Sequence, residues 1–507
     1  MSESESKTRP RGNRAKKRPL VIVESPAKAE TIGRFLGDDY VVDASYGHLR
    51  DLPGNAQERP DAIKGESWAE LGVNVDANFE PVYIVPAEKR EHVARLKREL
   101  KNADKLLVAT DEDREGEAIG WHLVELLEPD VPVERIVFHE ITKDAIEAAL
   151  RSPREIDRDL VDAQESRRIL DRLFGYSLSP VLWRKIQVGL SAGRVQSVAV
   201  RILVQRERER AAFHHAAYWD IDATLRAELG VLPATLRRLG AERLPIGRDF
   251  DAASGELTAS GVRLLDESTV QALSAALQQT QPWTVTKVEA TPATKRPSPP
   301  FITSTLQQEA NRKLGFSARR TMQVAQSLYE GIDIGAAREG LITYMRTDSV
   351  TLAKQALAEA QSVIADLYGA DFSDGPRGYK TKTRNAQEAH EAIRPTHLAR
   401  RPETLRGILN NDQYRLYELI WQRTLASQMN NAKLERTVVE VEVPLSDDDH
   451  PAIFEARGSR IVFAGYLRVY QEGSDEPEVD ADERLLPHVD VGDTVQPAVL
   501  EPKRHET

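Results

Sequence analysis

The sequence predicts a multidomain fold that combines an α/β domain on a parallel sheet with helical domains and a β-rich domain. Short apolar runs at residues 20–23, 105–110 and 135–138 are separated by helical stretches, which is typical of a buried parallel sheet. Further along, residues 218–224 and 283–288 alternate between apolar and polar side chains, as half-buried strands do. The length of 507 residues allows roughly three to five domains.

The composition excludes several classes of protein. The sequence has no run of 18 apolar residues, so we expect no membrane span. It contains no cysteine, which rules out disulfides, cysteine-bound zinc and a cysteine nucleophile. Residues 1–18 are polar and basic without an apolar stretch, and they predict a disordered basic tail rather than a secretory signal. We therefore expect a cytoplasmic location.

Acidic side chains follow two of the predicted buried strands. Glu24 comes directly after the first apolar run, and Asp111, Asp113 and Glu115 come after the second. Chemistry in open α/β sheets sits at the carboxyl ends of the strands, and closely spaced carboxylates there suit Mg²⁺. The alternative is that acids at a helix N-terminus only complement the helix dipole.

A basic stretch follows the first domain, although the net charge of −11 argues against a general nucleic-acid coat protein. Residues 167–210 hold ten Lys or Arg and three Asp or Glu, a local balance of +7. Apolar side chains from Val195 to Leu203 recur at helical spacing and predict an amphipathic helix. The small residues of 191–193 just before it favour close approach to a phosphate. The alternative is a solvated basic face.

Tyr344 is the candidate nucleophile, since Ser, Thr, Tyr, Lys or His must serve in a cysteine-free chain if catalysis is covalent. It lies in the sequence LITYMRTDS, and if this segment is extended, Tyr344 and Arg346 point to the same side. The guanidinium would then favour the phenolate and bind a phosphate in bidentate fashion. From the residues alone, a buried structural tyrosine is favoured over a nucleophile.

Several sequence blocks resemble the bacterial topoisomerase I branch of the type IA DNA topoisomerases. LVIVESPAKA followed by LVATDEDREGEAIGWH is similar to the Toprim domain of that family, with its ExxxK start and DxDxE cluster intact. The resemblance extends over roughly residues 19–470, in the family's order, through the blocks FHEIT, DAQESRRILDRLFGYSLSPVLW, LSAGRVQSVAVR, TSTLQQEA, ITYMRTDS and NAQEAHEAIRP.

The resemblance implies a mechanism. Tyr344 would attack a DNA phosphodiester to give a 5′-phosphotyrosine and a free 3′-hydroxyl, and Arg346 would stabilise the charge of the transition state. Glu24 and Lys28 are candidates for protonating or orienting the leaving 3′-oxygen, and which of them does so stays open. The predicted Mg²⁺ ligands are Glu24, Asp111, Asp113 and Glu115. No ATP is required, in agreement with the absence of a GxxxxGK[ST] loop, and no zinc is expected.

The resemblance also implies DNA contacts. The strand would be single-stranded or part of negatively supercoiled DNA, held through phosphates rather than base edges. His390 and Arg394 are four residues apart, which predicts a shared helix face that ends at Pro395. The predicted DNA-binding residues are His48, Arg135, Arg167, Arg168, Arg172, Lys185, Ser191, Ala192, Gly193, Arg194, Val195, Gln196, Arg346 and His390.

The family layout predicts a ring assembled from domains that are inserted in one another. The strand-like residues 437–443 would return to the β-rich arch, and residues 292–301 (PATKRPSPPF) read as a linker. The predicted ranges are a tail at 1–18, a Toprim domain at 19–155, the first part of a helical gate domain at 156–215, the first part of the arch at 216–300, a helical nucleophile domain at 301–430, and the arch return with a truncated end at 431–507.

One departure from the family pattern leaves two functions open. The segments that resemble PPxRYSEASLVK and GIGRPSTYA in the family are not found, so half of the gate domain and the tail are expected to be missing. The first hypothesis is a type IA topoisomerase that acts as a monomer at the nucleoid and relaxes negative supercoils. The alternative is a fragment that binds or nicks single-stranded DNA without efficient relaxation. Another Toprim enzyme, such as a primase or nuclease, is disfavoured by the ITYMRTDS block.

Overall fold

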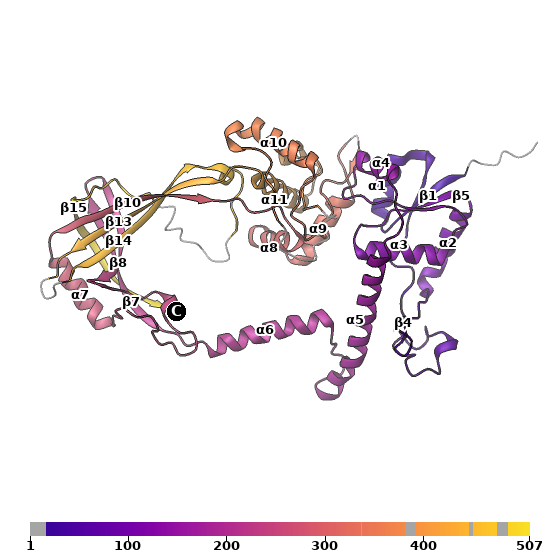
Figure 1. The fold of residues 1–507 in the computed structure, drawn as a ribbon, viewed down its shortest axis with the longest axis horizontal. Coiled ribbons are helices and arrows are strands. Elements are labelled where there is room, and N and C mark those ends of the chain that lie inside the picture. The colour runs from indigo at the N-terminus through magenta and orange to yellow at the C-terminus, as the bar shows by residue number, and fades with distance from the viewer. Residues whose placement is uncertain (1–16, 336, 381–390, 446–449, 474–484) are drawn as a thin grey trace, which may run out of the picture. The chain divides into compact units, whose positions relative to one another are not determined.

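The computed structural model describes residues 17–335, 337–380, 391–445, 450–473 and 485–507 (Figure 1). The chain divides into two compact units, and each is formed by segments that are far apart in the sequence. Unit 1 contains residues 1–197, 299–363 and 377–424, and unit 2 contains residues 198–298, 364–376 and 425–507. All but the last two residues of the predicted tail lie outside the described residues.

Unit 1 is built on a four-stranded parallel sheet with the strand order β2-β1-β5-β6. Two of the three predicted apolar runs coincide with β1 and β5, which are confirmed as neighbouring strands. The third run begins only at the end of β6, because residues 136–138 leave the sheet. The strands are β1 (Arg18–Val23), β2 (Val41–Ala44), β5 (Ala103–Val108) and β6 (Val133–Arg135).

Helices of unit 1 follow the sheet strands and complete the core. Isoleucine, leucine and valine side chains of β1 and β5 are fully buried against α2 and α3. The long α5 packs on α3 and runs away from the sheet (Figure 1). The helices of the N-terminal part are α1 (Pro26–Leu36), α2 (Arg90–Lys101), α3 (Arg114–Leu127), α4 (Lys143–Arg151) and α5 (Arg158–Lys185).

The candidate nucleophile Tyr344 lies in the second segment of unit 1, residues 299–363, outside the helices and strands. Residues 299–363 contribute α8 and α9, and α9 contacts α1. The helices α6, α10 and α11 run from one unit into the other. The elements are α8 (Thr303–Leu314), α9 (Ala318–Glu330), α10 (Lys354–Tyr368), α11 (Asn411–Ser427) and the short strands β3 (Val73–Asn74), β4 (Glu80–Pro81), β11 (Ile332–Asp333) and β12 (Arg338–Glu339).

Unit 2 is an antiparallel sheet of order β14-β13-β10-β15-β7-β8-β9, which closes on itself because β14 also pairs with β8. The strands predicted at 218–224, 283–288 and 437–443 are confirmed as parts of β7, β10 and β13. Trp283 and Phe454 pack in its core with ring centroids 4.8 Å apart. The elements are β7 (Ala217–Ala227), β8 (Gly230–Leu239), β9 (Glu242–Arg243), α7 (Glu267–Gln279), β10 (Trp283–Lys295), β13 (Ala432–Val443), β14 (Ala452–Phe463) and β15 (Thr494–Glu506).

Two local predictions are wrong. Residues 292–295 are not linker, because they continue β10 and pair with β13 as far as Lys295. Residues 391–395 are not helical, since Ile393 and Pro395 instead form isolated bridges with Phe301 and Ile342. His390 itself lies outside the described residues.

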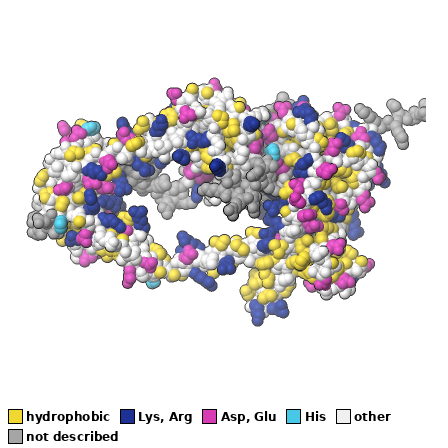
Figure 2. Space-filling view, viewed as in Figure 1, with side chains coloured by type: hydrophobic (Ala, Val, Ile, Leu, Met, Phe, Trp, Pro, Cys, Tyr) yellow, Lys and Arg dark blue, Asp and Glu magenta, His cyan; other side chains and the backbone are white. Residues whose placement is uncertain are grey.

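The predicted amphipathic helix is present as α6 (Arg194–Ala212), but its apolar stripe is not buried. Within the described part of the chain no residue of α6 is buried, and Leu203 is 69% exposed. Figure 2 shows apolar side chains at the surface of α6 and of the far end of α5, interspersed with Lys and Arg. Periodicity thus predicted the helix correctly and its packing incorrectly.

Among the described residues, no helix combines the length and the apolar character that crossing a membrane requires.

A buried ion-pair network ties β6 and α3 to the chain that leads into α5. Glu117 is 0% exposed and accepts hydrogen bonds from Arg135 Nε at 3.0 Å, Arg154 Nη1 at 2.7 Å and the Asp157 amide at 2.7 Å. Removing one partner from such a network leaves the other charge buried without compensation.

We predict that Glu117→Gln lowers the free energy of unfolding of unit 1 by about 3–5 kcal/mol, because Arg135 would keep its buried charge without a counter-charge. The matched control is Glu125→Gln on the exposed side of α3, which should change stability by no more than about 0.5 kcal/mol. Urea unfolding combined with hydrogen exchange of the β5 amides measures both. Equal stability of the two variants would contradict the assignment.

Candidate active site

The carboxyl ends of β1 and β5 bring Glu24, Lys28 and Asp111 together. Lys28 lies in the first turn of α1, whose N-cap Ser25 accepts a hydrogen bond from the Lys28 amide at 3.4 Å. The Lys28 ammonium is 2.6 Å from Glu24 Oε2 and also contacts Asp111 Oδ1, and the Asp111 amide donates to Glu24 Oε1. With an exposure of 1%, Lys28 bridges the acids of two neighbouring strands inside the protein.

Asp113 connects this group of side chains at the carboxyl ends of β1 and β5 to Tyr344. One carboxylate oxygen caps α3 by accepting from the Gly116 amide at 2.8 Å, and the other accepts from the Tyr344 hydroxyl at 2.6 Å. A Cβ at Gly116 would lie 2.2 Å from the Asp111 carbonyl oxygen, so the tight turn requires glycine there. The structure therefore brings the predicted nucleophile and the predicted acidic cluster into direct contact.

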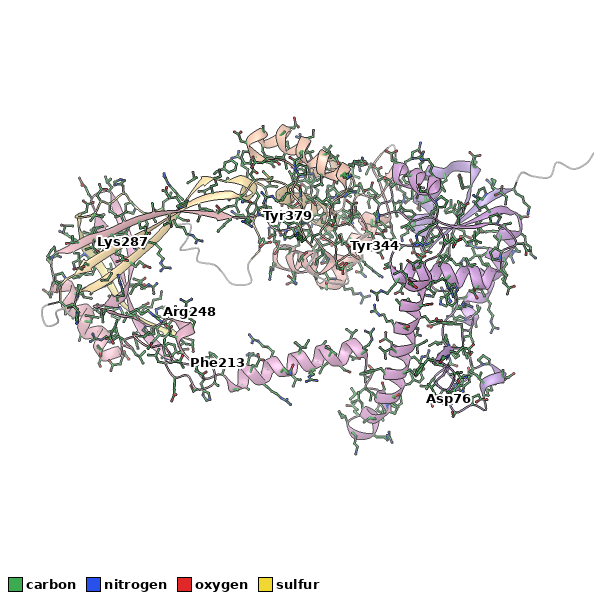
Figure 3. All side chains as sticks on the ribbon, viewed as in Figure 1. Asp76, Phe213, Arg248, Lys287, Tyr344 and Tyr379 are labelled. Carbon is green, nitrogen blue, oxygen red and sulfur yellow. The ribbon has the colours of Figure 1, made fainter. Side chains whose placement is uncertain are left out.

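Backbone hydrogen bonds fix the segment that carries Tyr344, the residue labelled in Figure 3. The Tyr344 amide donates to the His139 carbonyl at 2.9 Å, and the Thr343 amide donates to the Arg394 carbonyl at 2.9 Å. The chain bends at residues 345–346 rather than continuing as a strand, so the same-side argument for an extended segment does not apply. Tyr344 is nevertheless 3% exposed, whereas Arg346 is exposed.

Tyr329, at the end of α9, is a site residue that the sequence predictions missed. Its hydroxyl donates to Asp111 Oδ1 at 3.2 Å, its ring is edge-on to Tyr344 at 5.3 Å, and the Lys28 ammonium lies 5.2 Å from its centroid. It is 0% exposed. No motif around it points to chemistry, because one tyrosine in an amphipathic helix looks like a core residue.

The local charges work against ionisation of Tyr344 in this arrangement. Burial, with the carboxylates of Asp111 and Asp113, raises the pKa of Tyr344, and the Arg346 charge lowers it in part. Burial and the neighbouring Glu24 also raise the pKa of Asp111. Burial opposes the charge on Lys28, but Asp111 and Glu24 outweigh it and raise the pKa of that ammonium. The hydroxyl of Tyr344 consequently needs a proton acceptor to react, and Asp113 is already hydrogen-bonded to it.

The predicted magnesium ligands have suitable chemistry but are not gathered around a common point. Within the described residues, no group of three acidic or histidine side chains is arranged to hold a metal ion. Lys28 engages Glu24 and Asp111, and Asp113 binds Tyr344. Glu115 turns towards His48, whose Nε2 is 3.5 Å from Glu115 Oε1. The all-oxygen donor set fits Mg²⁺, and its use as a ligand set stays a prediction.

Two arginines predicted to contact DNA are instead buried. The side chain of Arg135 is 0% exposed, and besides Glu117 it donates to the Asp111 carbonyl at 2.6 Å and to the Thr110 carbonyl at 2.8 Å. Arg172 is 5% exposed and donates to the Pro53 carbonyl at 2.6 Å. These contacts correct the predicted roles: Arg135 holds the end of β5 in place, and Arg172 anchors a loop on α5.

Apart from His48 and Arg346, the other predicted DNA-binding residues described in unit 1 lie on α5 and on the segment that follows it. Arg167 and Lys185 are exposed, while Arg168 forms a two-pronged ion pair with Asp51 at 2.8–2.9 Å. The segment of Ser191, Ala192, Gly193, Arg194, Val195 and Gln196 is held against α5. Its Ala192 amide donates to Ser179 Oγ at 3.1 Å, and Arg194 Nε donates to Asp171 at 2.9 Å.

His48 is positioned by a buried aromatic and cationic cluster. Its ring is edge-on to His122 at 5.6 Å. Arg50 Nε donates to His122 Nδ1 at 2.5 Å, and the Arg50 guanidinium lies 4.8 Å from the Trp121 ring centroid. Burial, together with the Arg50 charge, lowers the pKa of His122 to about 3. His122 is therefore a neutral acceptor in the folded protein.

This neutrality predicts an acid-dependent loss of stability. Below a pH of about 6.5 the unfolded chain protonates His122 and the folded chain does not, so unfolding becomes easier by at most about 1.4 kcal/mol per pH unit down to about pH 3. His122→Gln keeps an acceptor oxygen for Arg50 and should flatten this dependence. The exposed His488→Gln should leave it in place. Urea unfolding at pH 7, 5.5 and 4.5 measures the slopes, and an unchanged slope in the first variant would contradict the prediction.

Two family models together match most of the chain. A family model for the Toprim domain matches residues 19–141, and a family model for DNA topoisomerase matches residues 155–507. DNA topoisomerase 1 of Synechococcus elongatus is 53% identical over 492 residues, which are 96% of this chain and 54% of that protein. DNA topoisomerase 1 of Mycobacterium tuberculosis H37Rv is 49% identical over 522 residues, which are 100% of this chain and 55% of that protein.

A solved structure is similar as well. Full-length topoisomerase I from Thermotoga maritima matches with a TM-score of 0.75 and 36% identity, over 96% of this chain and 72% of that one. The chain spans about half the length of the curated relatives it matches. With a family model matched over more than half of its residues and with its Toprim sheet placed against Tyr344, the chain belongs to the bacterial DNA topoisomerase I family, the type IA topoisomerases.

Proposed function

We propose that the chain catalyses the type IA reaction: it cleaves one DNA strand through Tyr344, lets another strand pass and reseals the break without ATP. The hydrogen bond between the Tyr344 hydroxyl and Asp113 carries this proposal. It places a phenol next to a proton acceptor, beside an exposed guanidinium that can bind phosphate.

Residues of this chain can accept and donate the protons that the proposed cleavage step requires. The Tyr344 oxygen bonds to phosphorus while its proton passes to Asp113, and the bond from phosphorus to the 3′-oxygen breaks. The leaving 3′-oxygen takes a proton, for which Lys28 is the positioned donor, with Glu24 aligning it at 2.6 Å. The favourable charge of Arg346 acts on both the phenolate and the phosphate oxygens. The phosphotyrosine ester retains the bond energy, so reversal reseals the strand.

The carboxylates of Glu24, Asp111, Asp113 and Glu115 are the proposed magnesium ligands. A bound Mg²⁺ would supply positive charge that aligns the broken strand for resealing. Because the pKa of Asp111 is raised by burial and by Glu24, added positive charge at this edge would stabilise the ionised carboxylates.

Tyr344 has to become accessible before DNA can reach it. With 3% of its surface exposed, it reacts only after the segment around residue 344 separates from the edge of the N-terminal sheet. Two hydrogen bonds would have to break: the Tyr344 hydroxyl donates to Asp113, and the Ser25 hydroxyl donates to Glu330 of α9 at 2.7 Å. We propose single-stranded or negatively supercoiled DNA as the substrate, with the protein acting as a monomer in the cytoplasm at the nucleoid.

We expect a labelled single-stranded oligonucleotide, trapped with SDS, to form a covalent adduct with the chain. Tyr344→Phe should abolish the adduct, because the attacking oxygen is missing, whereas Tyr329→Phe should reduce it without abolishing it. Denaturing gel electrophoresis measures the adduct. An adduct that survives Tyr344→Phe would refute the nucleophile assignment.

Plasmid relaxation distinguishes the full reaction from the fragment alternative. The match over 96% of the chain favours the enzyme, so we expect negatively supercoiled plasmid to be relaxed with Mg²⁺ and not after its removal with EDTA. Tyr344→Phe is the control for contaminating activity. Adduct formation without relaxation would favour the fragment alternative, in which the chain cleaves single strands but does not pass them.

A further inference from the structure

Tyr46 is an exposed aromatic residue in an unusual backbone conformation. It lies in the loop after β2, next to the carboxyl end of β1. Its φ angle is 58°, in the left-handed region that a bulky side chain rarely adopts, and its surface is 50% exposed. The ring therefore gains little from burial, although the backbone conformation has a cost. Phe79 shares this combination, so what distinguishes Tyr46 is its place beside Glu24 and the cations near it.

The loop that holds Tyr46 is bonded directly to the strand end that carries Glu24. The Ser45 amide donates to the Val23 carbonyl at 2.8 Å, and the Gly47 amide donates to the Glu24 carbonyl at 3.2 Å. On the far side of the loop, His48 contacts Glu115. Tyr46 thus lies two residues from one predicted DNA contact and next to the backbone of a catalytic acid.

Lys89, in the turn before α2, and His92, in α2, lie next to Tyr46. Lys89 Nζ donates to the Tyr46 carbonyl at 2.9 Å, and the edge of His92 packs on the ring at 4.9 Å. His92 is itself fixed by donating to the Ala44 carbonyl at 2.8 Å. Together they line an open cavity of about 460 Å³, formed by Tyr46, Glu88, Lys89, Glu91, His92, Arg95 and Arg98.

The cavity has cations available for a ligand. Arg95 is neutralised by both carboxylate oxygens of Asp43, each at 2.7 Å. In the described part of the chain, neither Lys89 nor Arg98 has a carboxylate within ion-pair distance. Glu88 and Glu91 repel an anionic ligand in this cavity. A phosphate is therefore attracted only if it lies closer to Lys89 and Arg98 than to these two carboxylates. A ring face beside unpaired cations is the arrangement with which proteins hold single-stranded nucleic acid.

We propose that this Tyr46 surface, made of Tyr46, Lys89 and Arg98, binds a nucleotide of the single DNA strand that passes the active site. A base stacks on the Tyr46 ring, and the phosphates next to it contact Lys89 and Arg98. The inference rests on the proposed function for its ligand and extends it, because it adds a stacking position in the loop between β2 and α2.

An abasic-site scan combined with substitution of Tyr46 tests this inference. Binding is measured by fluorescence anisotropy with the full chain carrying Tyr344→Phe, so that no cleavage occurs, and an oligonucleotide of about 20 nucleotides. Tyr46→Asn removes the ring with a residue that accepts the left-handed backbone, and Tyr46→Phe retains the ring. The matched control is Phe79→Asn, since Phe79 has a φ of 59° and is also 50% exposed.

We expect Tyr46→Asn to weaken binding about tenfold, with Tyr46→Phe and Phe79→Asn close to the parent. One abasic position should weaken binding by the parent by a similar factor and have little further effect in Tyr46→Asn, which identifies the stacked base. Lys89→Gln and Arg98→Gln should each reduce the slope of log affinity against log salt by about 0.7.

Unchanged binding by Tyr46→Asn, or the same loss in Phe79→Asn, would overturn the inference, as would the absence of any abasic position coupled to Tyr46. The covalent adduct is measured in parallel with the unsubstituted chain. If the adduct fails to form while the coupling persists, the proposed function is wrong and the Tyr46 surface stands as a site for single-stranded DNA.

Discussion

The buried ammonium of Lys28 is the interaction on which the active site depends. Parallel strands place Glu24 and Asp111 at the same sheet edge, and the capping of α3 adds Asp113. Carboxylates this close repel one another when they are removed from water. Lys28, 1% exposed and in contact with both Glu24 and Asp111, offsets that repulsion from within. In the proposed reaction, the same positive charge would act where the leaving oxygen develops negative charge.

How much of this site can be predicted from the sequence depends on whether a residue's role follows from its neighbours in the chain. Glu24 and Asp111 were predictable, because each follows an apolar run that had to be a buried strand. Asp113 was assigned as a metal ligand, whereas its contact with Tyr344 joins residues 231 positions apart and has no local signal. Tyr344 itself was identified through the family resemblance, since the residues alone favoured a structural tyrosine.

The misassigned residues share a physical cause. Arg135 and Arg172 were predicted to contact DNA, but both are buried with satisfied hydrogen bonds, and composition does not reveal burial. Tyr329 was missed for the converse reason, because a functional tyrosine inside a helix has the same pattern as a core tyrosine. In α6 the period of 3.6 residues predicted the helix. Whether its apolar face is buried depends on packing partners, which periodicity does not encode.

The negative charge around Tyr344 explains why the proposed DNA binding needs contacts outside the active site. A phosphate that approaches Tyr344 meets the carboxylates of Asp113 and Glu115, and one such pair at ~4 Å repels by about 4 kcal/mol at an effective dielectric of about 20. His48 contributes most to lowering the pKa of Glu115, and the charges of Arg346 and Arg167 lower it further. The two arginines therefore offset part of the repulsion of a phosphate. Two cations at the acids do not also provide the attraction that holds a strand. Contacts away from the scissile bond therefore have to provide the affinity, and they are most effective where cations without an ion pair lie near a ring on which a base can stack. On the β2 side of the sheet, Tyr46 with Lys89 and Arg98 meets that requirement.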